Sequence, residues 1–179
     1  MVTAAKPKVG GAIYVAPANS TLPTAADDTL DAAFKSLGYV SDEGLTRAVD
    51  LDTDVVKAWG GDTVYVMDNG KTETFQFSML DATSADVLKV IYGDSNVTGT
   101  ALATGISIVS NNTEKGSHCY VVDMIEKDNT LHRIVIPNGI VSDLDDITYV
   151  DNEVLAYGVT ITAIADATGN TVYEYLKTS

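Results

Sequence analysis

The chain has 179 residues, 45% of them hydrophobic, which predicts one domain over residues 1–179 with a substantial core. Its 25 acidic residues against 11 lysines and arginines give a formal net charge of −14, which argues against a protein that grips DNA by neutralising phosphates. We expect no export signal and no membrane span, and the single cysteine, Cys119, excludes an internal disulfide and a thiolate metal cluster.

Residues 1–25 are predicted to form an extended N-terminal arm, because prolines and polar residues surround a short apolar patch. One strand is expected near Ile13–Val15. Four apolar residues then recur at the spacing of an amphipathic helix that ends before Gly38, with Asp28 or Thr29 available as its N-cap. These four are Leu30, Ala33, Phe34 and Leu37.

Residues 38–70 form an acidic strand and loop region. Three aspartates alternate there with mostly apolar residues, which predicts a strand with one acidic, solvated side and one buried side. They are Asp50, Asp52 and Asp54. The only tryptophan, Trp59, precedes Gly60 and Gly61. It is either a core anchor beside a β-bulge or a subunit-interface residue, because a lone tryptophan rarely builds a sugar or base site unaided.

The residues that follow predict a β-hairpin. Strands are expected at Thr63–Met67 and Thr72–Leu80, joined at Asp68-Asn69-Gly70, because Asn-Gly supplies the positive φ angles of a tight turn. The alternation in the second strand turns three side chains toward the core. These are Phe75, Phe77 and Met79.

The second half predicts one more helix and several strands. Thr83 to Asp86 is similar to a capping box, and an apolar stripe from Val87 to Ile91 ends at Gly93. Strands are expected at Ile106–Val109, Cys119–Ile125, Leu131–Ile136, Leu155–Ala163 and Val172–Leu176, with a turn at Pro137-Asn138-Gly139. The fold class is therefore mainly β, a sandwich or barrel with one or two short flanking helices and a long extended loop.

The sequence signals for a catalytic or metal-binding site are weak. His118 and Cys119 are adjacent on a strand and so point to opposite faces, and His132 could reach Cys119 only through tertiary pairing. The spacing of Asp50, Asp52 and Asp54 is similar to that of an EF-hand loop, but this sequence lacks the glycine and the final glutamate that such a loop requires.

A second acidic cluster contains no cation. It consists of Asp143, Asp145, Asp146, Asp151 and Glu153. Paired carboxylates serve glycosidases, but this chain has few aromatic residues to line a sugar cleft, so we interpret the cluster as surface charge. No nucleotide-binding or hydrolase motif occurs. We expect no catalytic residue, no metal site and no cofactor.

Several blocks resemble the major tail (tail tube) proteins of long-tailed, siphovirus-type bacteriophages that infect Gram-positive bacteria. The blocks are Gly38 to Gly44, Lys57 to Asp62, Val87 to Gly93, Asn96 to Gly99, Arg133 to Gly139 and Thr160 to Ala163. Their order and spacing, more than any single block, carry the resemblance. It covers most of the chain from Gly38 onward.

The resemblance implies a structural virion protein, not an enzyme, made in the host bacterial cytoplasm. Its β-sandwich would close into hexameric rings that stack into a hollow tail tube through which DNA passes without specific binding. Its partners would be further copies of itself and the tail tape-measure, terminator and baseplate proteins, with no membrane. Many relatives append an immunoglobulin-like domain, for which this chain shows no sequence.

Within such a tube, an acidic lumen would keep DNA off the wall by repulsion. We expect lumen-facing carboxylates among Asp50, Asp52, Asp54, Asp143, Asp145 and Asp146. We expect assembly contacts at Trp59, Gly60 and Gly61. Residues 1–25 and 38–70 should be mobile in a free subunit and ordered by neighbours, because both are long and polar and neither has enough apolar residues to fold against its own core. Both are candidates for pairing sheet edges between protomers.

The alternative from another class is a secreted carbohydrate-binding β-sandwich module. Four tyrosines would be its platforms: Tyr14, Tyr65, Tyr120 and Tyr149. That alternative predicts a monomer that binds glycans, whereas the tail tube prediction requires rings or tubes.

Overall fold

The computed structural model describes residues 3–8 and 12–178. These residues contain eleven strands, one α-helix and two single turns of 3₁₀-helix. The strands are β1 (Ala5–Pro7), β2 (Ile13–Pro17), β3 (Lys35–Ser36), β4 (Thr46–Lys57), β5 (Thr63–Met79), β6 (Val97–Thr98), β7 (Ser107–Ile108), β8 (His118–Glu126), β9 (Thr130–Leu144), β10 (Tyr157–Ala163) and β11 (Tyr173–Thr178). The α-helix is α1 (Ala85–Tyr92), and the 3₁₀ turns lie at Asp94–Asn96 and Leu102–Thr104.

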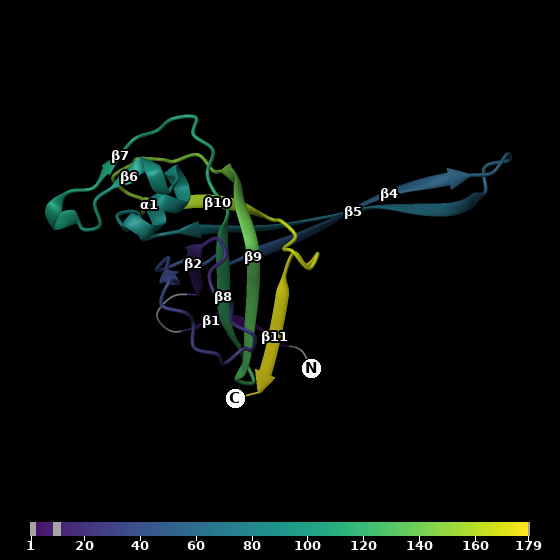
Figure 1. Ribbon diagram of the computed structural model, residues 1–179, viewed down its shortest axis with the longest axis horizontal. Coiled ribbons are helices and arrows are strands. Elements are labelled where there is room, and N and C mark those ends of the chain that lie inside the picture. Colours follow the sequence, from purple (N-terminus) through teal and green to yellow (C-terminus); the bar gives the residue numbers. More distant parts are fainter. Residues whose placement is uncertain (1–2, 9–11, 179) are drawn as a thin grey trace.

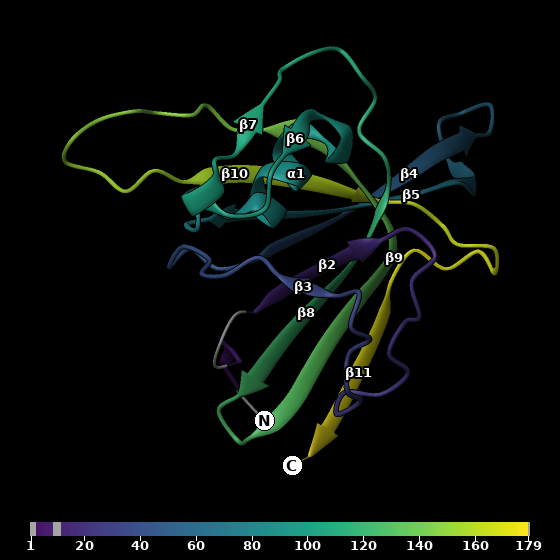
Figure 2. The same ribbon diagram turned by 60° about the vertical axis from the view of Figure 1, so that its left-hand side comes forward.

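Nine strands form one antiparallel sheet in the order β3-β2-β8-β9-β10-β5-β4, with β1 added on β8 and β11 added on β9. The long strand β9 connects two parts of this sheet. Its first half pairs with β11 and its second half with β10. Strands β8, β9 and β11 run together, while β10, β5 and β4 cross them (Figures 1 and 2). The separate pair β6–β7 lies beside α1 (Figure 1).

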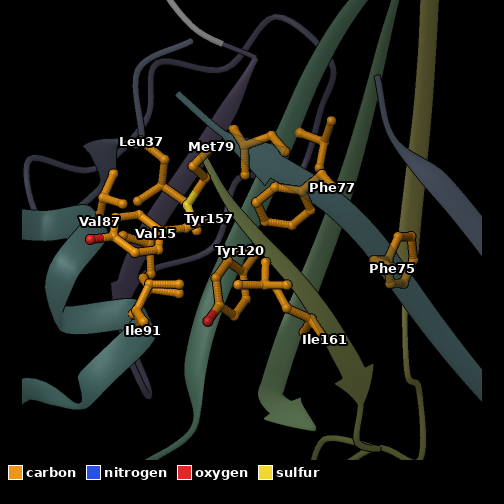
Figure 3. Packing of buried hydrophobic residues seen from close by; sticks show 14 of the residues in the cluster. Val15, Leu37, Phe75, Phe77, Met79, Val87, Ile91, Tyr120, Tyr157 and Ile161 are labelled. Carbon is orange, nitrogen blue, oxygen red and sulfur yellow. The ribbon is translucent and has the colours of Figure 1, made fainter. Parts of the chain in front are cut away.

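The core lies where these two parts of the sheet and α1 meet. Alternate residues of β5 and β10 point into it, as the period of a half-buried strand requires. Val87 and Ile91, one helical turn apart on α1, face Leu37 and Met79 across the cluster (Figure 3). The core-facing prediction for Phe75, Phe77 and Met79 is confirmed.

Strands β4 and β5 continue beyond the body as a long ribbon (Figure 1). The ladder pairs Thr46 with Gln76 at its base and Lys57 with Thr63 near its tip. The turn is built by Gly60 and Gly61, whose φ angles are +117° and +97°, values that favour glycine. We call residues 48–72 of this ribbon the distal hairpin.

The hairpin predicted around Asp68-Asn69-Gly70 is wrong. Strand β5 runs unbroken through these residues, and its turn lies earlier, at Trp59 to Gly61. Asp52 pairs with Gly70 and Thr53 with Asp68, which leaves Asn69 as the extra residue of a β-bulge. The positive φ of Gly70 therefore serves the bulge and not a turn. We expected a turn at Asn69-Gly70 and a bulge at Gly60-Gly61, and the structure has the reverse.

The helix predicted over residues 30–37 does not form. The segment makes a turn in which the Phe34 amide donates to the Asp31 carbonyl, and then pairs as β3 with β2. Phe34 and Leu37 pack in different clusters, Phe34 beside Cys119 and Leu37 in the main core. A helix would place both on one face, and the two-sided packing here requires extended chain.

The turn predicted at Pro137-Asn138-Gly139 is also wrong, because β9 passes straight through it. His118 pairs with Gly139 and Tyr120 with Ile136, so β9 carries an extra residue opposite Cys119. A proline is tolerated at such a bulge, where it breaks no ladder hydrogen bond. Gly139 allows a close approach, since a Cβ there would lie 2.8 Å from both Ile161 and Tyr120.

The remaining elements confirm the mainly β class with a short helix. Helix α1 ends at Gly93 as predicted, although Ser84 makes no side-chain cap hydrogen bond, so the capping box is wrong. The strand expected near residue 13 forms and is buried in the sheet, which contradicts the view that residues 1–25 cannot pack on their own core. Residues 1–2 and 9–11 of that N-terminal arm lie outside the described residues. No helix in the described part of the chain has the length and apolar character to cross a membrane.

Candidate assembly surfaces

The distal hairpin is exposed on both sides. Every residue of β4 is exposed, and so is every residue of β5 from Thr63 to Thr72. The buried side predicted for the Asp50–Asp54 strand is therefore wrong, since Leu51 on that side is 67% exposed. Trp59 at the tip is fully exposed, so the core role expected as one alternative is wrong, while the interface role stays a prediction. An isolated two-stranded ribbon is marginal in water, so this one needs a surface to lie on.

The two sides of the distal hairpin differ in chemistry. Residues paired across an antiparallel ladder share a face, so Leu51 lies beside Lys71 and Val55 lies beside Val66. This apolar side continues the core-facing side of the sheet, which ends on the body at Phe75. It carries Val49, Leu51, Val55 and Val66, all of them exposed. Between Phe75 and these residues the same side carries the charged side chains of Arg47, Glu73 and Lys71, so the exposed apolar residues form a patch that is separate from the core.

The opposite side of the ribbon carries the aspartates, together with the exposed side chains of Val56, Tyr65 and Met67 nearer the tip. Asp50 pairs with Thr72 and Asp54 with Met67, and Asn69 donates to the Asp54 carboxylate at 3.0 Å. Toward the body the same side carries threonine, serine and glutamine side chains of β4, β5 and β10: Thr46, Thr74, Gln76, Ser78, Thr160 and Thr162. This surface is the reverse of the core-facing side across three strands.

The structure brings two residues of the second acidic cluster, Asp143 and Asp145, onto this same surface. Asp143 pairs with Thr160, which pairs in turn with Gln76. The Asp145 carboxylate lies over Gly158, on the same side, where a glycine Cβ would contact it. We call the surface that carries Asp50, Asp52, Asp54, Asp143 and Asp145 the acidic face. Asp146, Asp151 and Glu153 are exposed in the loop that follows β9.

An ion-pair network anchors the base of the hairpin. Arg47 donates to Glu73 at 2.9 Å and to Glu174 at 3.1 Å, which connects β4, β5 and β11. Burial raises the pKa of Glu73, but hydrogen bonds from Thr171 and Arg47 outweigh it and hold that pKa below its ordinary value. Glu174 also accepts from His132 at 2.6 Å. The network fixes the direction in which the hairpin leaves the body.

The histidines and the cysteine do not form a catalytic group. The His118 ring contacts Asp94 at 3.1 Å, whereas the Cys119 thiol is buried and donates to the Pro137 carbonyl. His132 lies between Glu126 and Glu174. Burial raises the pKa of the Cys119 thiol, which keeps it protonated and unreactive. No three potential metal ligands gather anywhere in residues 3–8 and 12–178.

The tyrosines of the carbohydrate-binding alternative are not a platform. Tyr120 is 1% exposed within the core, while Tyr65 lies on the distal hairpin and Tyr149 lies in the loop after β9. Their separation on different elements gives no shared stacking surface.

Sequence reasoning missed the apolar side of the distal hairpin as an exposed surface. The alternation of Val49, Leu51 and Val55 with aspartates is the same for a strand packed on its own core and one packed on a neighbour. The length of the strand pair is the only signal that could have separated them, because β5 has 17 residues where strands of about five or six are typical.

Comparisons with known proteins give matches to solved structures and to one family model. Two solved structures are similar over nearly the whole chain: the tube terminating cap of an anti-feeding prophage (9% identity, 97% of this chain and 92% of that chain, TM-score 0.48) and the sheath-tube complex of an extracellular contractile injection system (10% identity, 96% and 93%, TM-score 0.49). A search of curated proteins finds no match. The family model for the phage tail tube protein matches residues 4–179. The chain belongs to the phage tail tube protein family, whose members are structural, non-enzymatic components of the phage tail.

Proposed function

We propose that this tail tube protein, as one domain over residues 1–179, assembles into stacked hexameric rings, each distal hairpin lying with its apolar side on a neighbouring subunit. The single observation that carries the proposal is the uncovered apolar side of the distal hairpin, where Val49, Leu51 and Val55 are all exposed. A large exposed apolar surface marks an interaction site. The ring number of six rests on the family resemblance alone.

The acidic face would form part of the lumen wall. If the apolar side of the distal hairpin packs on a neighbour, the aspartates on the opposite side face away from that neighbour. Asp143 and Asp145 lie on the same side of the sheet on the body. A continuous acidic wall repels a passing polyanion, and DNA would cross the tube without specific binding.

The remaining parts of the proposal follow the resemblance. The phage would be of the long-tailed, siphovirus type with a Gram-positive host, and the protein would be made in the host cytoplasm before it enters the virion. Tape-measure, terminator and baseplate proteins would contact the tube along its bore and at its two ends. The similar structures are a tube terminating cap and a sheath-tube complex of their own systems.

The experiment compares two charge insertions on opposite sides of the distal hairpin. Leu51→Glu places a carboxylate on the apolar side and should abolish tubes in negative-stain images, with an unchanged melting temperature of the dilute subunit. Thr72→Glu is the matched control, since it adds the same charge at the pair next to Leu51 but on the acidic face. It should leave assembly intact. Normal tubes from Leu51→Glu would refute the docking of this side.

The lumen assignment has its own test. A reconstruction of the assembled tube should show the acidic face toward the bore. A reconstruction with both Asp50–Asp54 and Asp143–Asp146 on the outer surface would overturn it, while leaving the tube itself unaffected.

A further inference from the structure

The body carries a cleft that has no occupant among the described residues. Its volume is about 640 Å³, and it lies between β1, the start of β2, residues Val122 and Met124 of β8, and the segment 38–45 that leads into β4. Its apolar lining includes Ile13, Val122 and Met124, while Lys6 and Lys8 stand on the β1 side. A cleft of this size and composition is typical of a site that takes a bulky, mostly apolar group.

The cleft also contains an unsatisfied polar atom. The Ser41 hydroxyl is buried and has no hydrogen-bond partner in the described part of the chain. Buried hydroxyls are usually paired, and an unpaired one costs free energy. Since Ser41 lines the cleft, a group that enters beside it would supply the missing partner. The site thus fits an apolar group that has one polar atom.

The tip of the distal hairpin presents such a group. Trp59 is fully exposed and combines a large apolar ring with a single N–H donor. The hairpin extends about 36 Å from Thr46 to Lys57 at ~3.3 Å per residue, directed away from the body (Figure 1). Trp59 therefore cannot reach the cleft of its own chain.

We propose that this cleft receives the Trp59 tip of the distal hairpin from a second copy of the chain. The proposal rests on the assembly function above and names the receiving site. The indole ring packs on the apolar lining while its N–H donates to the Ser41 hydroxyl. The cleft lining carries both signs of charge, Lys6 and Lys8 against Asp42 and Glu43, so the fit rests on the apolar lining and on the Ser41 hydroxyl.

The contact is heterologous, because the donating and receiving surfaces are different parts of the subunit. Each subunit gives one tip and accepts one tip, so such contacts propagate and either close into rings or continue as a filament. Since the segment 38–45 both lines the cleft and leads into β4, an occupied cleft also holds the base of the receiving subunit's own hairpin. The geometry couples each contact to the next.

The test is a disulfide between two singly substituted chains. One chain carries Ala58→Cys beside the tip, and the other carries Asp42→Cys at the edge of the cleft. Both are assembled together and oxidised. We expect a mixed dimer in denaturing gels from assembled tubes. The control mixes Ala58→Cys with Ala103→Cys, an exposed position beyond β6, and should give no such dimer. The native Cys119 is buried and should not compete.

A second measurement separates this proposal from the wider one. Trp59→Ala should raise the concentration needed for assembly by about 30-fold, the loss expected for a buried aromatic anchor, and Trp59→Phe should recover part of it. If Leu51→Glu abolishes tubes but the Ala58/Asp42 pair gives no dimer beyond the control, the cleft is not the receiving site and the docking of the hairpin side stands. If Leu51→Glu and Trp59→Ala both assemble normally, both proposals fail.

Discussion

The buried ion pair between Arg133 and Asp123 offers the most direct test of how the body is held together. Arg133 is 1% exposed, and its Nε and Nη2 donate to the two Asp123 oxygens at 2.6 and 2.9 Å. Its Nη1 donates to the carbonyls of Ala25 and Asp28 at 3.0 and 2.8 Å. One side chain on β9 thus fastens β8 and the loop after β2.

Replacing it by Arg133→Leu leaves the Asp123 carboxylate buried without its bidentate partner. Breaking such a pair from one side costs about 3–5 kcal/mol. For a chain of this length each kcal/mol lowers the melting temperature by about 2–4 °C, so we expect a fall of about 6–20 °C. The measurement is thermal unfolding by circular dichroism on dilute, unassembled subunits.

The matched control is Lys177→Leu, which removes another basic side chain bonded to the same loop. Lys177 contacts Asp27, but both side chains are largely exposed, so solvent screens the pair and little change is expected. Double replacement with leucine at 123 and 133 should recover part of the loss, because no charge is then left buried. If Arg133→Leu lowers the melting temperature no more than Lys177→Leu does, the buried pair does not fasten the body.

Three other predictions use the same assays. Trp59→Ala should leave the melting temperature of the free subunit unchanged while it impairs tube formation, and a matching loss of stability would return this residue to a folding role. Gly139→Ala should cost about 1–3 kcal/mol of stability, because its Cβ meets packed core side chains. Gly158→Ala meets the exposed side chain of Asp145, whose carboxylate makes the two closest contacts and can rotate away, so it should cost less. The pKa of Glu73 is lowered in the fold, so its contribution to stability is present above the unfolded pKa of about 4.3 and is lost on acidification through the folded value. Melting temperature should therefore fall less steeply below about pH 4.5 in Glu73→Gln than in the unaltered protein, and parallel curves would contradict that reasoning.

The sequence was sufficient for elements whose own side chains decide their structure. Phe77 and Met79 alternate into the core, and the stripe from Val87 to Ile91 makes α1, because period and packing agree there. The helix predicted over residues 30–37 was wrong, because Phe34 and Leu37 pack in two different clusters, which an extended chain allows. Tertiary packing overrode local pattern at that point.

The turns failed for a different reason. Asn69-Gly70 and Gly60-Gly61 both provide positive φ, and a sequence does not say which pair reverses the chain and which only bends a strand. The same limit applies to Pro137, where the bulge depends on the neighbouring strand β8. The sequence predicted that the aspartates of β4 share one side of the strand. That Asp143 lies on the same surface depends on the strand order, which the sequence does not show.

That strand order also sets when each part of the subunit can form. The two strands of the hairpin are near neighbours in sequence, and their ladder can zip from the Gly60-Gly61 turn. Ile13 instead pairs with Val122, so β2 has only the two-residue strand β3 as a partner until more than a hundred further residues have been made. During synthesis at about 5–20 residues per second, an adhesive hairpin exists for seconds on an unfinished body. Premature self-association is therefore a hazard that depends on translation speed and local protein concentration. A low concentration of nascent chains should favour correctly built tubes.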